Sequence, residues 1–314
     1  MTPTALRRRA PRVSVVIPCY NGARFLARAI ASVQAQRYPR DRLEIVVVDD
    51  GSSDDSHRLA CELAERDGRI LALRQANAGP AAARNFGIAC SQGDLIAFLD
   101  CDDTWAPAKL VRQARRLRDD PALGLVHCGC RFVDAQGAEV HGWVRRSRNL
   151  EGYVLLELFC DFFLITSAVM VRRRCLEAVG GFDPALRVGE DYDLFLRLAA
   201  HSPIGCVDAP LLHRTLRPDS LSRLDFDLDA RNDLLILERF IRANPEFARR
   251  HHDAVQIRFA SYLYDYGYRL LEGGQVPRAR AVLAQSIRRR PTMGAAKALG
   301  RSRLPRAAWP LLRA

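Results

Sequence analysis

The 314-residue chain is predicted to form an α/β fold, in which a mostly parallel sheet carries helices on both faces and an α-helical appendage follows. Three observations lead to this prediction. Short apolar runs alternate with segments of helical periodicity as far as about residue 225, which is typical of a parallel sheet with crossover helices. Carboxylates directly follow several of these runs, at positions where open α/β sheets bind ligands. Beyond residue 226 the apolar residues recur only with helical spacing.

The strands are predicted from β-branched or apolar runs, and the helices from apolar residues spaced three and four apart. Strands are expected at residues 13–17, 44–48, 69–73, 95–99, 165–171 and 204–207, with one or two more within 123–133. Helices are expected at residues 22–36, from 53 or 54 to 66, at 80–90, 107–119 and 151–163, and from about 190 onward. In the appendage, helices are expected at residues 227–242, 247–272 and 277–289, the last two as an antiparallel pair.

These patterns divide the chain into a basic arm (1–12), an α/β domain (13–225), a helical appendage (226–290) and a basic tail broken by prolines (291–314). The formal net charge of +12 is concentrated at the two ends. Residues 1–40 contain eight arginines and no acid, and residues 273–314 contain nine arginines, one lysine and no acid. This distribution indicates an anionic surface or substrate as a partner. We expect the tail, with Trp309 and Leu311, to bind an anionic membrane surface; a solvated basic tail is the alternative.

The nine cysteines are scattered and form no Cys-x-x-Cys pair. Reduced thiols in a cytosolic protein are therefore expected. No apolar segment has the length of a signal-peptide core or of a spanning helix, so neither export nor membrane insertion is expected.

An acidic motif follows the apolar run Leu95–Leu99, where Asp100, Asp102 and Asp103 occupy three of four positions. Carboxylates this close repel one another unless a cation, solvent or hydrogen-bond donors compensate them. Oxygen ligands of this kind suit Mg²⁺ or Mn²⁺, which proteins usually hold with one or two carboxylates and substrate phosphates. A solvated acidic loop is the alternative for an isolated Asp-x-Asp.

Two other segments repeat this pattern. Asp49 and Asp50 end the second predicted strand before a glycine, and Glu190, Asp191 and Asp193 lie in the first turn of a predicted helix. Helix capping and the helix dipole offer an ordinary explanation for acids at a helix start. Three acids in four positions are more than a cap requires.

Phosphate-binding loops of the two commonest kinds are missing, because the turn after the first strand is neither Gly-x-Gly-x-x-Gly nor a Walker loop. A basic nucleic-acid-binding protein would explain the arginine-rich ends. No platform of aromatic and basic residues and no known binding motif supports that class, so no nucleic-acid partner is expected.

Five blocks together resemble the inverting family 2 glycosyltransferases of bacteria, which have the GT-A fold, a Rossmann-like nucleotide-diphospho-sugar transferase fold. They read VSVVIPCYN (13–21), VVVDDGSSD (46–54), NAGPAAARN (77–85), FLDCDDTW (98–105) and GEDYDL (189–194). They occur in the order found in that family, and the likeness extends over about residues 12–225 but not over the helical tail.

The resemblance implies a binding site for a nucleotide-sugar donor. Pro18, Tyr20 and Asp50 match the residues that hold the nucleotide base, and the Asp50 carboxylate would face the uracil of a UDP-sugar. Arg84 matches a basic position of the third block and is a further candidate for donor binding.

The resemblance also implies a metal site and a catalytic base. Asp100 and Asp102 match the Asp-x-Asp motif; Asp102 is the better candidate for direct metal contact, and Asp100 is also a candidate for donor binding. Asp191 matches the general base, with Glu190 as a secondary candidate. The loop 213–222 matches a loop near the donor diphosphate, where this chain has Arg217 in place of the histidine of many relatives.

The expected activity is therefore an inverting, metal-dependent transfer of a hexosyl or N-acetylhexosaminyl group to a hydroxyl of a glycan or lipid-linked acceptor, as in cell-surface polysaccharide synthesis. The resemblance implies Mn²⁺ or Mg²⁺ as cofactor and a cytoplasmic location, peripheral on the inner face of the cytoplasmic membrane. A relative that binds sugar nucleotides without turnover is the alternative.

Overall fold

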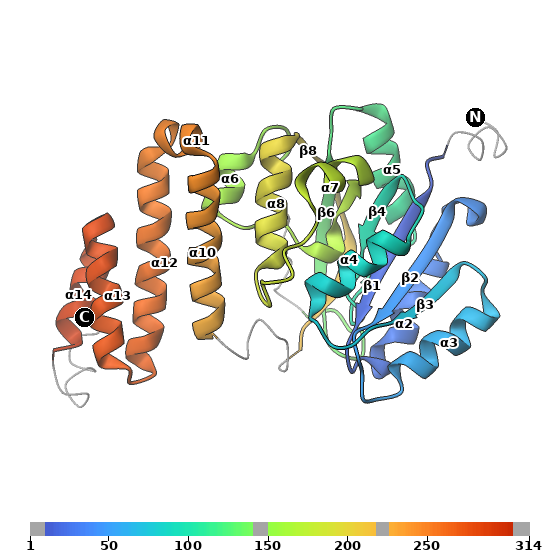
Figure 1. The fold of residues 1–314 in the computed structure, drawn as a ribbon, viewed down its shortest axis with the longest axis horizontal. Coiled ribbons are helices and arrows are strands. Elements are labelled where there is room, and N and C mark those ends of the chain that lie inside the picture. The colour runs from blue at the N-terminus through green and yellow to red at the C-terminus, as the bar shows by residue number, and fades with distance from the viewer. Residues whose placement is uncertain (1–9, 141–149, 218–225, 304–314) are drawn as a thin grey trace. The chain divides into compact units, whose positions relative to one another are not determined.

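Figure 1 shows the protein as a computed structural model, which describes residues 10–140, 150–217 and 226–303. Most of the predicted basic arm, the end of the loop 213–222 and the last residues of the tail, including Trp309 and Leu311, lie outside the described residues. The chain divides into two compact units, of which the first comprises residues 1–158 and 162–220. The second comprises residues 159–161 and 221–314.

The first unit is built on one mixed sheet. Its strands are β1 (Val13–Cys19), β2 (Leu43–Asp49), β3 (Ile70–Arg74), β4 (Leu95–Phe98), β5 (Thr104–Trp105), β6 (Leu125–Val133), β7 (Met170–Arg172) and β8 (Ile204–Thr215), in the order β3-β2-β1-β4-β7-β6-β8-β5. Strands β1 to β4 pair in parallel, β7 runs antiparallel between β4 and β6, and β6 and β8 are parallel. The parallel half brings the carboxyl ends of β1, β2 and β4 to one edge (Figure 1).

Helices cover both faces of this sheet, as the alternation of strands and helices predicts. The first helices are α2 (Ala23–Gln34), α3 (Ser56–Arg66), α4 (Pro80–Cys90) and α5 (Lys109–Asp119), with a short 3₁₀ turn, η1, at Arg40–Arg42. Helices α2, α3 and α5 share a core with the odd-numbered residues of β1, whereas α4 packs on the opposite face against Val46 and Val48. Gly87 permits the close approach of α4 to β1, because a Cβ there would lie 2.5 Å from Val16 Cγ1.

The second half of this unit differs from the sequence prediction. The expected helix 151–163 is reduced to α6 (Leu155–Cys160), and the expected strand 165–171 becomes a 3₁₀ turn, η2 (Thr166–Ala168), followed by the three-residue strand β7. Helix α7 (Arg173–Val179) was not predicted; α8 (Glu190–His201) was. Strand β8 continues to Thr215, so the predicted basic loop begins inside a strand. The run 165–171 shows neither the spacing of a helix nor the alternation of a strand, so its sequence does not distinguish a turn from a strand. Its conformation is decided by the pairing of β7 with β4 and β6.

The second unit is helical. Its helices are α10 (Phe226–Ala243), α11 (Pro245–Arg250), α12 (His252–Glu272), α13 (Val276–Arg289) and α14 (Met293–Arg301), and α12 and α13 form the predicted antiparallel pair (Figure 1). The single helix expected at 247–272 is divided at His251, which has non-helical φ −115°. Part of the expected tail is helical, since Pro291 follows α13 and the Thr292 side chain then caps α14 by accepting from the Ala295 N–H at 3.2 Å.

Within the described residues, no helix combines the length and the apolar character that crossing a bilayer requires.

Candidate active site

The candidate site lies where β1, β2 and β4 end, because three of the acidic or polar turns follow these neighbouring strands. The turns after β1 and β2 bind each other: the Asn21 N–H donates to Ser52 Oγ at 2.9 Å and the Ser53 N–H donates to Asn21 Oδ1 at 2.8 Å. Asn21 has φ 48°, a left-handed conformation that asparagine tolerates better than most residues. Beside it, Pro18 is half-buried and Tyr20 is 54% exposed, so the Tyr20 ring is available to a ligand.

Asp50 is buried at the start of the second turn and organises the loop that follows β3. Its Oδ1 accepts from Gln75 Nε2 at 2.8 Å and from the Ala78 N–H at 2.9 Å, and its Oδ2 accepts from the Gly79 N–H at 2.9 Å. The carboxylate predicted to read a base therefore also holds the turn that begins α4, and it keeps acceptor capacity on Oδ2. Asp49, which is also buried, lies with Oδ2 3.2 Å from Arg74 Nε.

The acidic motif after β4 contains three carboxylates in different environments. Asp100 is the most exposed of them, at 39% of its side chain. The pKa of Asp102 is raised, first by burial and then by the charge of Asp100, although Arg217 opposes the shift. Asp103 is fully buried, and burial raises its pKa well above the usual range while its Oδ1 accepts from the Thr215 N–H at 2.9 Å. The motif is thus anchored through Asp103 and presents Asp100 and Asp102.

Arg84 connects this motif to helix α8. Its guanidinium donates to Asp100 Oδ1 at 2.8 Å and to Glu190 Oε1 at 2.6 Å, and its side chain is only 6% exposed. Burial raises the pKa of Glu190 to about 7 even though Arg84 opposes the shift. Arg84 therefore holds the carboxyl groups of Asp100 and Glu190, and its role in donor binding stays a prediction.

Asp191, the predicted base, lies at the start of α8. Gly189 precedes this helix with φ 82°, a conformation that favours glycine and that turns the chain into the helix. Thr166 Oγ1 donates to Asp191 Oδ2 at 2.9 Å, and the neighbouring Ser167 Oγ accepts from the Asp100 N–H at 3.0 Å. The turn η2 thus orients both the base helix and the acidic motif.

Arg217 forms an ion pair with Asp102, at 3.1 Å from Nη1 to Oδ2, and its guanidinium lies 5.0 Å from the centre of the Phe25 ring. Arg28 from α2 reaches the same place, where its Nη2 donates to Thr215 Oγ1 at 3.2 Å. The guanidinium groups of Arg28 and Arg217 therefore lie beside the acidic motif.

The carboxylates fit a hard divalent cation. Asp100 and Asp102 are two oxygen donors of like charge, which both engage arginines. The described part of the chain contains no cluster of three metal-ligating side chains. An ion at Asp100 and Asp102 would therefore take further oxygens from substrate and solvent, as Mg²⁺ and Mn²⁺ commonly do.

The model of the family described as Glycosyl transferase family 2 matches residues 14–180, which is more than half of the chain. The chain belongs to glycosyl transferase family 2. An uncharacterized glycosyltransferase of Nostoc sp. (strain PCC 7120) is 37% identical to it over 179 residues, which cover 55% of this chain and 54% of the relative. The succinoglycan biosynthesis protein ExoU of Rhizobium meliloti is 34% identical over 202 residues, which cover 60% and 57%. The chain thus spans a little over half of the length of these two relatives.

Solved glycosyltransferases share the fold. The structure of S. aureus TarS 1–349 in complex with UDP-GlcNAc has a TM-score of 0.65 at 16% identity and covers 93% of this chain and 91% of that one. The mannosyltransferase PcManGT from Pyrobaculum calidifontis, in complex with GDP-Man and Mn²⁺, has a TM-score of 0.63 at 23% identity and covers 92% and 79%. The predicted family and the predicted GT-A fold class are confirmed.

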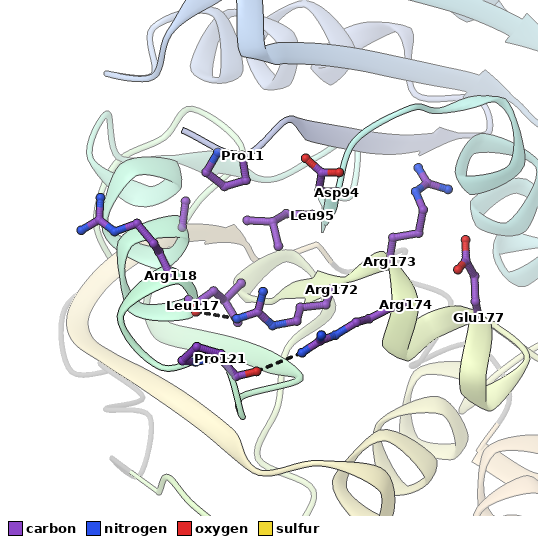
Figure 2. A pocket seen from close by; sticks show the side chains of 11 residues that line it. Pro11, Asp94, Leu95, Leu117, Arg118, Pro121, Arg172, Arg173, Arg174 and Glu177 are labelled. Carbon is purple, nitrogen blue, oxygen red and sulfur yellow. Dashed lines mark hydrogen bonds between the residues drawn. The ribbon is translucent and has the colours of Figure 1, made fainter. Parts of the chain in front are cut away.

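A cavity of about 530 Å³ in this family 2 member lies away from the acidic motif. Its lining includes Pro11, just before β1, and Asp94, just before β4, so it lies toward the amino ends of the parallel strands (Figure 2). Arg172 and Arg174 in its wall donate to main-chain carbonyls, as the dashed lines of Figure 2 show for Leu117 and Pro121. These arginines hold the end of α5 and the chain after it, which is an adequate reason for their presence.

Sequence reasoning missed the residues that connect the motifs. Thr166 and Ser167 lie in a run interpreted as a strand, and Thr215 and Arg28 belong to no block of the family pattern. The sequence signal for these contacts was the polar pair Thr166 and Ser167 within an otherwise apolar segment, because buried polar side chains need hydrogen-bond partners.

Proposed function

We propose that this protein is an inverting, metal-dependent glycosyltransferase. In this proposal it moves a hexosyl or N-acetylhexosaminyl group from a nucleotide-diphosphate donor, a UDP-sugar, to a hydroxyl of a glycan or lipid-linked acceptor in cell-envelope polysaccharide synthesis. The complexes of TarS with UDP-GlcNAc and of PcManGT with GDP-Man and Mn²⁺ support a nucleotide-sugar donor and a divalent cation. The name of the Rhizobium relative supports a role in polysaccharide synthesis.

One observation carries the proposal: Arg84 bridges Asp100 and Glu190 and so joins the acidic motif to the first turn of α8, which also contains Asp191. The two groups belong to segments about ninety residues apart in the sequence. A helix cap or a solvated acidic loop would account for either segment alone. Neither accounts for a buried arginine that joins them.

The chemistry requires one displacement at the anomeric carbon. Asp191 takes the proton of the acceptor hydroxyl, whose oxygen forms the new glycosidic bond as the bond between the anomeric carbon and the diphosphate oxygen breaks. Thr166 Oγ1 donates to Asp191 Oδ2 at 2.9 Å and the Tyr192 N–H donates to Asp191 Oδ1 at 2.8 Å, and these two hydrogen bonds orient the carboxylate. Asp100 and Asp102 would hold the divalent cation, which supplies charge neutralisation for the departing diphosphate. Tyr20 and Asp50 bind the nucleotide base.

The metal and donor are tested by thermal shift with UDP- and GDP-sugars, each with Mn²⁺ or with EDTA, since a ligand that binds the folded state raises the melting temperature. The wild type is expected to respond to UDP-sugars only with the metal. Asp102→Asn should lose this response and remain folded, whereas the control Asp120→Asn, in a surface ion pair with Arg116, should retain it. An unchanged response of Asp102→Asn, or full activity in EDTA, would refute the metal role.

The base is tested by donor binding and transfer in one variant. Asp191→Asn should bind the donor normally and lose about 10²- to 10⁴-fold in turnover, the range for a positioned general base. Near-normal turnover would assign the base to another residue, with Glu190 and Asp193 next in line. If the wild type and the variant both bind the donor and neither transfers the sugar, that result would support the alternative of a non-catalytic relative.

We also propose that the protein is cytoplasmic and associates peripherally with the inner face of the cytoplasmic membrane through its basic C-terminal region. Within the second unit, the exposed side chains of Arg288, Arg290 and Lys297 add positive charge, and Met293 is 74% exposed nearby in the chain. Such charges bind anionic lipid with about 1 kcal/mol each near the surface.

Flotation with anionic and neutral liposomes tests this association. Removal of α13 would strip Ala279 and Val282 from the core that they share with α12, so a shorter deletion is preferable. A chain that ends at residue 303, and the triple variant of Arg288, Arg290 and Lys297 to glutamine, should each float less than the wild type with anionic liposomes. Equal recovery of all three, or binding that high salt leaves unchanged, would exclude an electrostatic anchor.

A further inference from the structure

Two of the nine cysteines lie in the motifs that form the candidate site. Cys19 ends β1 between Pro18 and Tyr20, and Cys101 lies between Asp100 and Asp102. Both are free thiols; Cys19 is buried and Cys101 is partly exposed. The activity proposed above uses neither of them.

The sheet register brings the two cysteines together. Val16 pairs with Phe98 in the parallel ladder of β1 and β4, and the Leu99 N–H continues it with a bond to the Val16 carbonyl. Cys19 is the last residue of β1, and Cys101 lies three residues after the end of β4, in the turn that follows that strand. Neighbouring strands lie about 4.8 Å apart, and disulfides span about 4.4–6.8 Å between Cα atoms.

The sulfur atoms face each other. A Cβ built on Gly22 would lie 2.7 Å from Cys101 Sγ and 3.0 Å from Cys19 Sγ, so both sulfurs point to one place at the start of α2. Glycine at position 22 leaves the space in which the two sulfurs meet.

We propose that Cys19 and Cys101 are a site of oxidative modification, at which an intrachain disulfide ties β1 to the acidic motif. The oxidant is hydrogen peroxide. Two S–H bonds and the peroxide O–O bond break, one S–S bond forms, and the two electrons and two protons pass to the peroxide oxygens, which leave as two molecules of water. A dithiol reductant reverses the step by exchange.

The disulfide lowers the affinity for metal and nucleotide, an effect that rests on the proposed function. The S–S bond is about 2.05 Å long, so it draws the end of β1 and the acidic motif closer together than they lie in the reduced protein. Cys101 is flanked by the two carboxylates that would hold the cation, so its movement displaces them. The Cys19 carbonyl accepts from the Asp50 N–H at 2.8 Å, so the same bond disturbs the base-binding turn.

Formation of the disulfide is tested by peptide mapping, which needs no nucleotide. The full-length reduced protein is titrated with hydrogen peroxide, free thiols are alkylated, and tryptic peptides are analysed by mass spectrometry. A link is expected between peptides 13–24 and 85–109. The second peptide also contains Cys90, so the variant Cys90→Ser should still form the link and Cys101→Ser should not. Oxidation of the partly exposed Cys61 without this link would overturn the proposal.

The effect is tested by titration of Mn²⁺ and UDP into reduced and oxidised protein. Affinity of the oxidised wild type should fall about 10- to 100-fold, the range for disturbed groups that orient metal ligands, and dithiothreitol should restore it. Cys19→Ser and Cys101→Ser should each give the same affinity before and after peroxide, and Cys61→Ser should behave as the wild type. A mapped disulfide with unchanged affinity would overturn the functional part. If the reduced protein binds no nucleotide, the proposed function fails, and the mapping still decides the disulfide.

Discussion

Replacement of Arg84 by methionine tests the connection between the two halves of the candidate site. Methionine keeps most of the length of the side chain and removes the guanidinium, so the carboxyl groups of Glu190 and Asp100 both lose a partner. Arg84 also lies over the Phe182 ring, at 5.3 Å from its centre, a contact that the methionine side chain can partly keep.

The magnitude follows from burial. The side chains of Arg84 and Glu190 are 6% and 9% exposed, and removal of one partner from a buried ion pair typically costs about 3–5 kcal/mol. Asp100 is 39% exposed, so solvent screens its pair with Arg84 and its share is small. We therefore expect the free energy of unfolding to fall by about 3 kcal/mol at neutral pH.

The loss depends on pH through Glu190. Burial raises the pKa of Glu190 to about 7, and Arg84 opposes this shift. Because the folded state binds the Glu190 proton more tightly than the unfolded state does, this carboxyl group lowers the free energy of unfolding increasingly as pH rises toward about 7. Without Arg84 the pKa rises further, and the carboxyl is neutral at pH 6. The loss in the variant should therefore be larger at pH 8 than at pH 6.

Urea denaturation at both pH values measures the effect, with UDP-sugar binding as a second readout. Arg58→Met is the matched control, because Arg58 also binds two carboxylates, of Asp55 and Glu62, but is 63% exposed. Its loss of stability should be much smaller, because solvent screens ion pairs at the surface. The double variant with Glu190→Gln should recover part of the loss, with a coupling of about 0.5–3 kcal/mol. A loss in Arg84→Met as small as that of the control, or no recovery in the double variant, would refute the reasoning.

Three other predictions concern single contacts. Lys109 is fully buried and burial lowers its pKa to about 8, so the wild type should gain stability between pH 8 and 10.5. Lys109→Met should remove this pH dependence in urea denaturation, although it also removes the hydrogen bond from Lys109 Nζ to Gln113 Oε1 at 2.8 Å. The Arg69 guanidinium holds the pKa of Asp67 well below its usual range, so Asp67→Asn should cost about 1.5–3 kcal/mol at pH 7 in urea denaturation. This cost should shrink progressively as pH falls below about 4, where the carboxyl group of the unfolded chain takes up its proton while that of the folded protein remains charged. Thr166→Val should lower kcat with little change in KM for the donor, because it removes the Thr166 hydrogen bond to Asp191 and leaves the turns after β1 and β2 unchanged. A change confined to KM would contradict this.

Local sequence determined the parallel half of the sheet. The strand predicted at Val13–Ile17 is found as β1, which continues for two more residues. Pro80 begins α4, as predicted from the preference of proline for the first turn of a helix. These segments carry their own periodicity, and sheet pairing agrees with it. The segment 165–171 carries no such period, so only its pairing with β4 and β6 made it a turn and a short strand.

The candidate site divides in the same way. The sequence by itself made Asp100, Asp102 and Asp191 candidates for the site, because carboxylates at the ends of strands and at the starts of helices can be recognised from the order of residues. The tertiary structure decided that Arg84 joins Asp100 to Glu190 and that Cys19 meets Cys101, contacts between residues up to 106 positions apart. Side chains so far apart meet only where crossover connections and strand order bring two segments to one edge, and no local pattern encodes that geometry.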